Sequence, residues 1–111
     1  MADSNRDHWT DELWVLVRRV PYGKVTSYGA LGRSLQRPLS GFLVGRAMAN
    51  CPSDVPWWRV VDRHGLFVVA KKDPVAAETQ RQKLKEEKTE MADEDQVSPS
   101  AFVDPDSLLS D

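Results

Sequence analysis

The chain has little of what most enzymes and secreted proteins carry. A single cysteine, Cys51, excludes an internal disulfide, and with only His8 and His64 to join it a Cys/His zinc site lacks ligands. No apolar run approaches the ~18 residues that a transmembrane helix needs. The first residues lack the apolar segment of a signal peptide. We therefore expect no metal or other cofactor, no membrane contact and a cytoplasmic location.

A catalytic nucleophile with its base is equally hard to assemble. Cys51 stands between Asn50 and Pro52, far from either histidine in the sequence, so nothing local lowers the pKa of its thiol or takes its proton. His8 and His64 fit surface positions, and a phosphate-cradling glycine loop is missing. A thiol enzyme that uses Cys51 is an alternative, which Cys51→Ser would test.

What is present fits one small domain with an uneven charge. The chain has 111 residues, of which 41% are hydrophobic and 29% charged. Its formal net charge is -2, but residues 86–111 contain nine acidic residues and one lysine. The first 85 residues therefore carry a net positive charge. Such asymmetry is typical of nucleic-acid-binding proteins, although a solvated surface with segregated charges is the alternative. We place a DNA-binding domain at 1–87 and an acidic, partly flexible tail at 88–111, with 101–103 as a candidate docking segment.

Hydrophobic spacing predicts a helix over 7–20 and a strand stub at 24–26. Two short helices follow, at 28–35, which Thr26 or Ser27 can cap, and at 41–50, which Ser40 can cap. This pair fits a helix-turn-helix, whose second helix is the usual DNA reader. The β-favouring runs 58–61 and 66–69 flank a turn and predict a hairpin, before a last helix that begins at Asp73-Pro74. The expected fold class is mainly α with a small β-hairpin, close to a winged helix-turn-helix.

Two adjacent tryptophans, Trp57 and Trp58, follow the predicted DNA-reading helix and lie between Pro56 and Arg59. Their aromatic faces offer surfaces on which a base can stack. The alternative is that both are packing residues. Neighbours in a strand point to opposite faces, so at most one of them is expected in the core.

The same segment carries a family resemblance. Residues 56–61, Pro-Trp-Trp-Arg-Val-Val, resemble the Pro-Cys-His-Arg-Val active-site motif of O6-alkylguanine-DNA alkyltransferases. They are more similar to the Pro-Trp-His-Arg-Val form of the alkyltransferase-like proteins, in which tryptophan replaces the acceptor cysteine. Residues 20–29 and 44–48 match the helix-turn-helix motifs of this family, and the resemblance extends over nearly the whole chain from about residue 8.

The resemblance implies a non-enzymatic sensor of DNA damage. It places Trp57 at the position of the alkyl-accepting cysteine and Trp58 at that of the activating histidine, so both halves of the nucleophile pair are missing. Tyr28 matches the tyrosine that rotates the target nucleotide out of the duplex, although a core aromatic is the alternative for it. The implied lesion pocket consists of Trp57, Tyr28, Trp58, Arg59 and Pro56.

The implied partner is double-stranded DNA that carries O6-alkylguanine, bound from the minor groove by a monomer that flags the lesion for nucleotide excision repair. Phe42 stands where the family places an arginine finger. The implied DNA contacts are Ser27, Arg37, Phe42, Arg46, Lys71 and Lys72. The alternative is a winged-helix transcription regulator without lesion preference, which would bind alkylated and plain DNA of one sequence equally.

Overall fold

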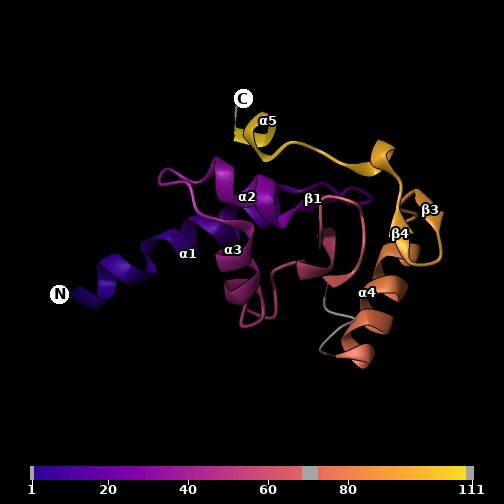
Figure 1. Cartoon of the computed structure of the whole chain (residues 1–111), viewed down its shortest axis with the longest axis horizontal. Coiled ribbons are helices and arrows are strands. Elements are labelled where there is room, and N and C mark those ends of the chain that lie inside the picture. Colours follow the sequence, from indigo (N-terminus) through magenta and orange to yellow (C-terminus); the bar gives the residue numbers. More distant parts are fainter. Residues whose placement is uncertain (1, 69–72, 110–111) are drawn as a thin grey trace.

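The computed structural model describes residues 2–68 and 73–109 (Figure 1). The helices are α1 Ala2–Arg19, α2 Tyr28–Ser34, α3 Gly41–Met48, α4 Pro74–Glu86 and α5 Pro105–Leu109, with 3₁₀ turns η1 Trp57–Arg59 and η3 Pro99–Ala101. The strands are β1 Thr26–Ser27, β2 Val60–Val61, β3 Met91–Asp93 and β4 Gln96–Val97. The predicted class, mainly helical with small sheets, is confirmed.

The predicted helix-turn-helix is formed by α2 and α3. Both helices begin at a serine cap: the Ser27 hydroxyl accepts from the Ala30 N–H at 3.1 Å, and the Ser40 hydroxyl accepts from the Leu43 N–H at 3.3 Å. The turn approaches α2 so closely that a Cβ on Gly32 would lie 2.1 Å from the Leu39 carbonyl oxygen. Only glycine fits there, so the packing of this unit is set by its own sequence.

Two hydrophobic clusters form the interior. The first core joins α1 to the helix-turn-helix and consists of Leu13, Leu16, Val17, Leu31, Leu35, Val44, Met48, Val55 and Val60. The second core joins segments far apart in the chain and consists of Val25, Val61, Phe67, Leu84, Val97 and Ala101. Val60 and Val61 of β2 thus face different cores, as the alternation of side chains along a strand requires.

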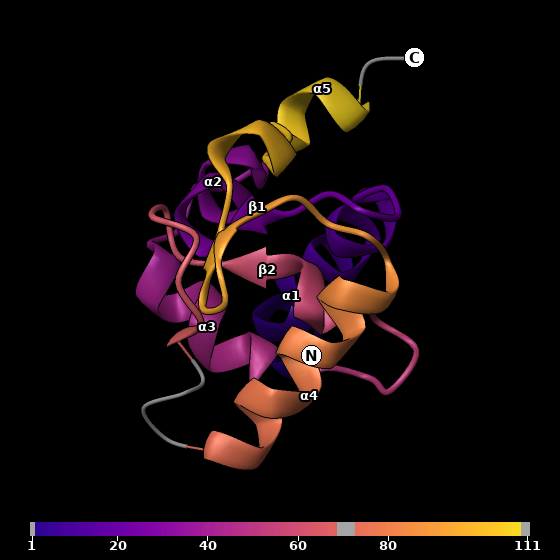
Figure 2. The ribbon, with the colours of Figure 1, turned by 90° about the vertical axis from the view of Figure 1, so that its right-hand side faces the viewer.

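The predicted hairpin of 58–61 and 66–69 is wrong over the residues that the structure describes, which reach Val68 in its second run; Val69 lies outside them. β2 pairs instead with β1 in parallel, with Thr26 opposite Val60 (Figure 2). The turn itself exists, since Gly65 has a φ of +86° and its N–H donates to the Asp62 carbonyl at 2.9 Å. However, a Cβ on Gly65 would lie 2.4 Å from the Val97 carbonyl oxygen. The tail segment around Val97 therefore lies against this turn, a long-range contact that no local pattern reveals.

The tail at 88–111, which was expected to be acidic and partly flexible, contributes side chains to the interior. β3 and β4 form an antiparallel hairpin, and Val97 and Ala101 are each 1% exposed in the second core. The docking segment at 101–103 is confirmed, because the Val25 N–H donates to the Ala101 carbonyl at 3.0 Å and the Val103 N–H donates to the Val25 carbonyl at 2.9 Å. Helix α5 then packs against α1 and α2. None of the helices in 2–68 and 73–109 is long and apolar enough to cross a membrane.

Candidate nucleic-acid interface

The helix-turn-helix presents cations and one large apolar ring to solvent. Arg37 in the turn and Arg46 on α3 are exposed, and Phe42, the second residue of α3, is 73% exposed. The Arg46 guanidinium carbon lies 6.0 Å from the centroid of the Phe42 ring, at the limit of a cation–π contact. This combination of positive charge and an exposed aromatic face is suited to a polyanion with flat bases.

Tyr28 and Trp57 are both half-buried, and both pack against the first core. The Tyr28 ring lies over α3, where a Cβ on Gly45 would stand 3.7 Å from a ring carbon. Burial, with a contribution from Asp62, raises the pKa of the Tyr28 phenol to about 12. The hydroxyl therefore stays protonated at neutral pH and can donate a hydrogen bond to an anionic oxygen.

The two adjacent tryptophans are not in a strand but in the 3₁₀ turn η1. Their ring centroids are 6.1 Å apart and their planes are inclined by 82°, an edge-to-face pair. Trp57 packs against the first core and Trp58 against the second. Both are half-buried, so each ring packs on a core with one part and is accessible to solvent with another.

Trp58 and Arg59 converge on one carboxylate, that of Glu87. The Trp58 Nε1–H donates to Glu87 Oε2 at 2.7 Å, and Arg59 donates from Nε at 3.0 Å and from Nη2 at 2.8 Å. The Gly23 N–H donates to Oε1 at 3.2 Å, and Arg59 Nη1 donates to the Val20 carbonyl at 2.8 Å. Burial by itself would raise the pKa of Glu87, but these hydrogen bonds, led by Arg59 and Trp58, hold the pKa below its usual range.

The surroundings of Trp58 add to this cluster. The Arg59 guanidinium carbon lies 5.8 Å from the Trp58 ring centroid and 5.7 Å from that of Tyr22, while Lys83 Nζ lies 5.1 Å from the Trp58 ring. Gln80 of α4, 1% exposed, donates to the Trp58 and Val60 carbonyls. Trp58 is therefore held from several sides, and it forms the edge-to-face pair with Trp57.

Glu87 is a site residue that the sequence did not reveal. It is the last residue of the predicted DNA-binding domain, directly before the acidic tail, and its side chain is only 6% exposed and forms a salt bridge with Arg59 at 2.8 Å. The local sequence, an acidic pair in a charged stretch, gives no signal that separates Glu87 from the exposed Glu86. Only the fold, which brings the end of α4 to η1, assigns the role.

The other predicted site residues are Pro56, Ser27, Lys71 and Lys72. Pro56 is buried and precedes η1, where its carbonyl accepts from the Arg59 N–H at 3.1 Å. Ser27 is 7% exposed, and its hydroxyl is already used as the α2 cap. Lys71 and Lys72 lie outside the described residues. The role of each in binding stays a prediction.

Two candidates for acid–base or thiol chemistry are set apart from this cluster. His64 is exposed in the turn before Gly65, as expected. Burial, with a smaller effect of Asp54, raises the pKa of the Cys51 thiol. A raised pKa leaves less thiolate at neutral pH, which disfavours the thiol-enzyme alternative.

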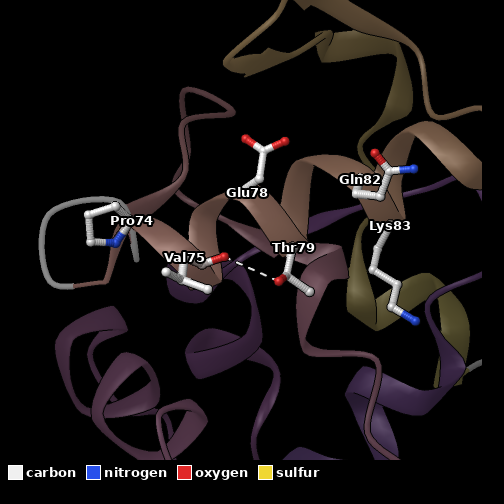
Figure 3. A pocket seen from close by; sticks show the side chains of 6 residues that line it. All are labelled: Pro74, Val75, Glu78, Thr79, Gln82 and Lys83. Carbon is white, nitrogen blue, oxygen red and sulfur yellow. Dashed lines mark hydrogen bonds between the residues drawn. The ribbon is translucent and has the colours of Figure 1, made fainter.

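A hollow of about 510 Å³ lies along α4 and is lined by residues of that helix (Figure 3). Val75, Thr79 and Lys83 follow one side of the helix, and Thr79 Oγ1 donates to the Val75 carbonyl at 3.2 Å. A smaller hollow of about 370 Å³ lies between the Arg63–His64 turn and the tail. Neither is lined by Tyr28 or Trp57, so both hollows are separate from the predicted lesion pocket.

The fold and its exposed cations define the class of protein: a helix-turn-helix DNA-binding domain. The model of the 6-O-methylguanine DNA methyltransferase DNA-binding domain matches residues 8–89, and the chain belongs to this family. The resemblance noted in the sequence is thereby confirmed.

Individual relatives narrow the likeness to the alkyltransferase-like proteins. Alkyltransferase-like protein 1 of Schizosaccharomyces pombe is 36% identical over 89 residues, covering 77% of this chain and 80% of that protein. A DNA base-flipping protein of Vibrio parahaemolyticus is 29% identical over 89 residues, covering 78% and 86%. The crystal structure of the S. pombe protein with damaged DNA containing O6-carboxymethylguanine superimposes with a TM-score of 0.77 at 27% identity, covering 87% of this chain and 95% of that one.

Proposed function

We propose that this chain is a sensor of alkylated DNA that performs no repair chemistry itself. It binds duplex DNA through α2 and α3 from the minor groove, turns an O6-alkylguanine out of the stack and holds it against Trp57. The observation that carries this proposal is the half-buried indole of Trp57, held edge-to-face by Trp58 beside the helix-turn-helix. The complex of the S. pombe relative with damaged DNA supports it.

The absence of transfer follows from the chemistry of indole. Trp57 stands where the family motif has its acceptor cysteine, and indole has no thiolate with which to displace the alkyl group. The Nε1–H of Trp58, at the histidine position, is a donor only and is used by Glu87. A base that has entered the pocket is therefore bound and left unchanged.

The energetics of flipping are compatible with this arrangement. Turning a nucleotide out of the duplex costs a few kcal/mol, least for a damaged base. Stacking on an aromatic ring returns about 1–3 kcal/mol per base. Tyr28, at the start of α2, is the residue that displaces the nucleotide, with its neutral phenol against the backbone phosphate.

The remaining contacts are electrostatic. Arg37 and Arg46 bind DNA phosphates, and Phe42 enters the stack of bases. Ser27 faces the DNA backbone, and Lys71 and Lys72 lie at the mouth of the lesion pocket. The sensor acts as a cytoplasmic monomer, and the protein–DNA complex, rather than any product, recruits nucleotide excision repair. Binding of this type weakens with salt, with a log–log slope of about -0.9 per phosphate contacted.

The test compares Trp57→Ala with a matched variant, Trp14→Ala, which also removes a tryptophan packed on the first core but lies on α1. Affinity is measured for two duplexes of one sequence, with and without one O6-methylguanine. Trp57→Ala should reduce the preference for the lesion by about 1–3 kcal/mol, roughly 5- to 150-fold. Trp14→Ala should lower Tm and leave the preference intact.

Three outcomes would overturn the proposal or its central contact. Equal binding of both duplexes by the unmodified chain would favour a regulator without lesion preference. Restored guanine, or an alkylated residue in the protein by mass spectrometry, would show transfer chemistry. A parallel loss of binding to both duplexes with a collapsed Tm in Trp57→Ala would make Trp57 a packing residue alone.

A further inference from the structure

The helix-turn-helix carries positive charge that its own sequence does not neutralise. Between Glu12 and Asp54 the chain contains no aspartate or glutamate. Outside this unit an arginine can be fully engaged, as Arg59 is by Glu87. On α2, by contrast, Arg33 is exposed, and within the part of the chain that the structure describes its side chain has no ion-pair or hydrogen-bond partner. Its charge is therefore available to an anion from outside the chain.

The Arg33 guanidinium lies back along α2, toward the start of the helix. A Cβ on Gly29 would lie 3.4 Å from Arg33 Nη1, so the cation covers the surface that this glycine leaves open one turn earlier. In an α-helix side chains lean toward the N-terminus, and residues four apart share one face. The charge is thus delivered to the first turn of α2, although Arg33 itself stands in the last turn.

The first turn of α2 is also where Tyr28 stands and where α2 meets α3. A Cβ on Gly41 would lie 3.1 Å from the Gly29 amide nitrogen, so the two backbones are in contact there. Tyr28 and Gly29 are consecutive, with Cα atoms about 3.8 Å apart. Phosphates of one DNA strand follow one another at about 3.4 Å along the helix axis. The Tyr28 phenol and the Arg33 cation are therefore placed for neighbouring phosphates of one strand.

The two side chains have complementary chemistry toward a phosphate. The Tyr28 phenol is neutral at pH 7, because burial and the nearby Asp62 raise its pKa to about 12. A neutral hydroxyl donates one hydrogen bond and supplies no charge. A guanidinium supplies a positive charge and can donate two parallel N–H bonds to one phosphate. A strand displaced by Tyr28 is consequently held more strongly when Arg33 lies beside it.

We infer that the Arg33 guanidinium binds the backbone phosphate next to the one that Tyr28 displaces, and that it holds the strand turned out while the damaged base occupies the pocket. This inference rests on the proposed function and adds to it a specificity-determining residue. The phosphate reaches Arg33 only when the nucleotide is displaced, so the contact favours the flipped lesion over intact DNA. Arg37 and Arg46, by contrast, contact phosphates of both.

The first measurement compares Arg33→Gln with Lys85→Gln, a matched control that removes the same charge from an exposed position on α4. The full chain and both variants are titrated with two duplexes of one sequence, with and without one O6-methylguanine. Arg33→Gln should bind the lesion duplex about tenfold more weakly, as expected for a hydrogen-bonded charge pair. On the plain duplex it should lose less than about threefold, and Lys85→Gln should lose no more than that on either.

The second measurement locates the contact on the DNA. Phosphates around the lesion are neutralised one at a time, on both strands, by a methylphosphonate linkage. In the full chain one position on the lesion strand should cost about tenfold. The same position should cost Arg33→Gln less than about twofold, because the contact is already lost. Tyr28→Phe should lose its sensitivity at the adjacent phosphate, and Arg33→Lys, which keeps the charge without the bidentate geometry, should lie between.

The failures of the inference and of the proposed function are distinguishable. If the full chain prefers the lesion but Arg33→Gln loses equally on both duplexes, or no more than Lys85→Gln, the inference is overturned and the sensor function stands. Losses that multiply independently at every phosphate, or a coupled phosphate on the opposite strand, also overturn it. If the full chain shows no preference for the lesion over guanine, both proposals fail together.

Discussion

The two cores of this small protein are built in different ways. The first core is formed by helices near one another in the sequence, and its geometry is set by serine caps and by glycines such as Gly32 at close approaches. The second core collects side chains from segments as distant as Val25 and Ala101, with Gln80 and Glu87 satisfied by contacts across 20 residues or more. Local signals determine the first core, and only the complete fold determines the second.

The two cores meet at residues 57–61. Trp57 and Val60 face the first core, while Trp58 and Val61 face the second. Residues 57–61, which carry the family resemblance, thus also connect the two cores, and we call them the joint between the cores. It follows that a change in the second core can reach the proposed lesion site through Trp58, without altering the helix-turn-helix itself.

The largest expected effect comes from Glu87→Ala, which removes the acceptor shared by Trp58 and Arg59. The Arg59 side chain is 14% exposed, so its charge would be left nearly buried and unpaired. Breaking a buried pair in this way costs about 3–5 kcal/mol. The free energy of unfolding, measured with urea, should fall by that amount, and the lesion preference should fall because Trp58 loses the bond that orients it.

The matched control for this change is Glu86→Ala, one residue earlier and exposed. Its effect should stay within about 0.5 kcal/mol. Similar losses for both variants would mean that the bonds of Glu87 contribute little beyond general electrostatics, and that Glu87 does not hold the joint together.

A second experiment asks whether the cores unfold together. Leu31 in the first core and Leu84 in the second are both fully buried, so Leu31→Ala and Leu84→Ala should each cost about 2–5 kcal/mol. Since β2 contributes to both cores, each variant should show one cooperative transition by far-UV circular dichroism and by tryptophan fluorescence. Separate transitions in Leu84→Ala, with the helix-turn-helix melting later, would show that the cores are independent.

The fold could be predicted from the sequence where local chemistry decides it. Ser27 and Ser40 mark the starts of α2 and α3, and Asp73-Pro74 marks the start of α4, whose cap the structure confirms. The error at 58–69 arose because β-favouring residues do not name their partner. Val60–Val61 pairs with β1, more than thirty residues away in the chain, instead of with the run that follows the turn.

The candidate site could be predicted only in part. Exposed Arg37, Phe42 and Arg46 lie on the helix-turn-helix as the motif implied. Trp57 and Trp58 point to different sides, as expected, but they do so in a 3₁₀ turn instead of a strand, and each packs against a core where at most one was expected to do so. The role of Glu87 could not be predicted, because its neighbours along the chain are also charged. Its hydrogen-bond partners come from distant segments, η1 and the turn at Gly23.

The smallest expected effect is a dependence of stability on acidic pH that passes through the joint between the cores. Hydrogen bonds from Arg59, Trp58 and Gly23 outweigh burial and lower the pKa of Glu87 in the folded protein. In the unfolded chain a glutamate titrates near about 4.3. The unfolded state therefore takes up the proton first, so the stabilisation from ionised Glu87 is fully present above that value and is lost as pH falls through the lower folded pKa.

Comparison with Glu87→Gln isolates this contribution from that of the other carboxylates. Glutamine keeps an acceptor oxygen for Trp58 but does not titrate, so its stability should be lower than that of the unmodified chain at pH 7. The gap should be constant from pH 7 to about 5 and should narrow below about 4.3. Urea unfolding at a series of pH values measures it. If the difference in the free energy of unfolding between the two proteins stays constant through the acidic range, the charge of Glu87 does not contribute to stability. Hydrogen bonding to a neutral oxygen would then be what holds the two cores together.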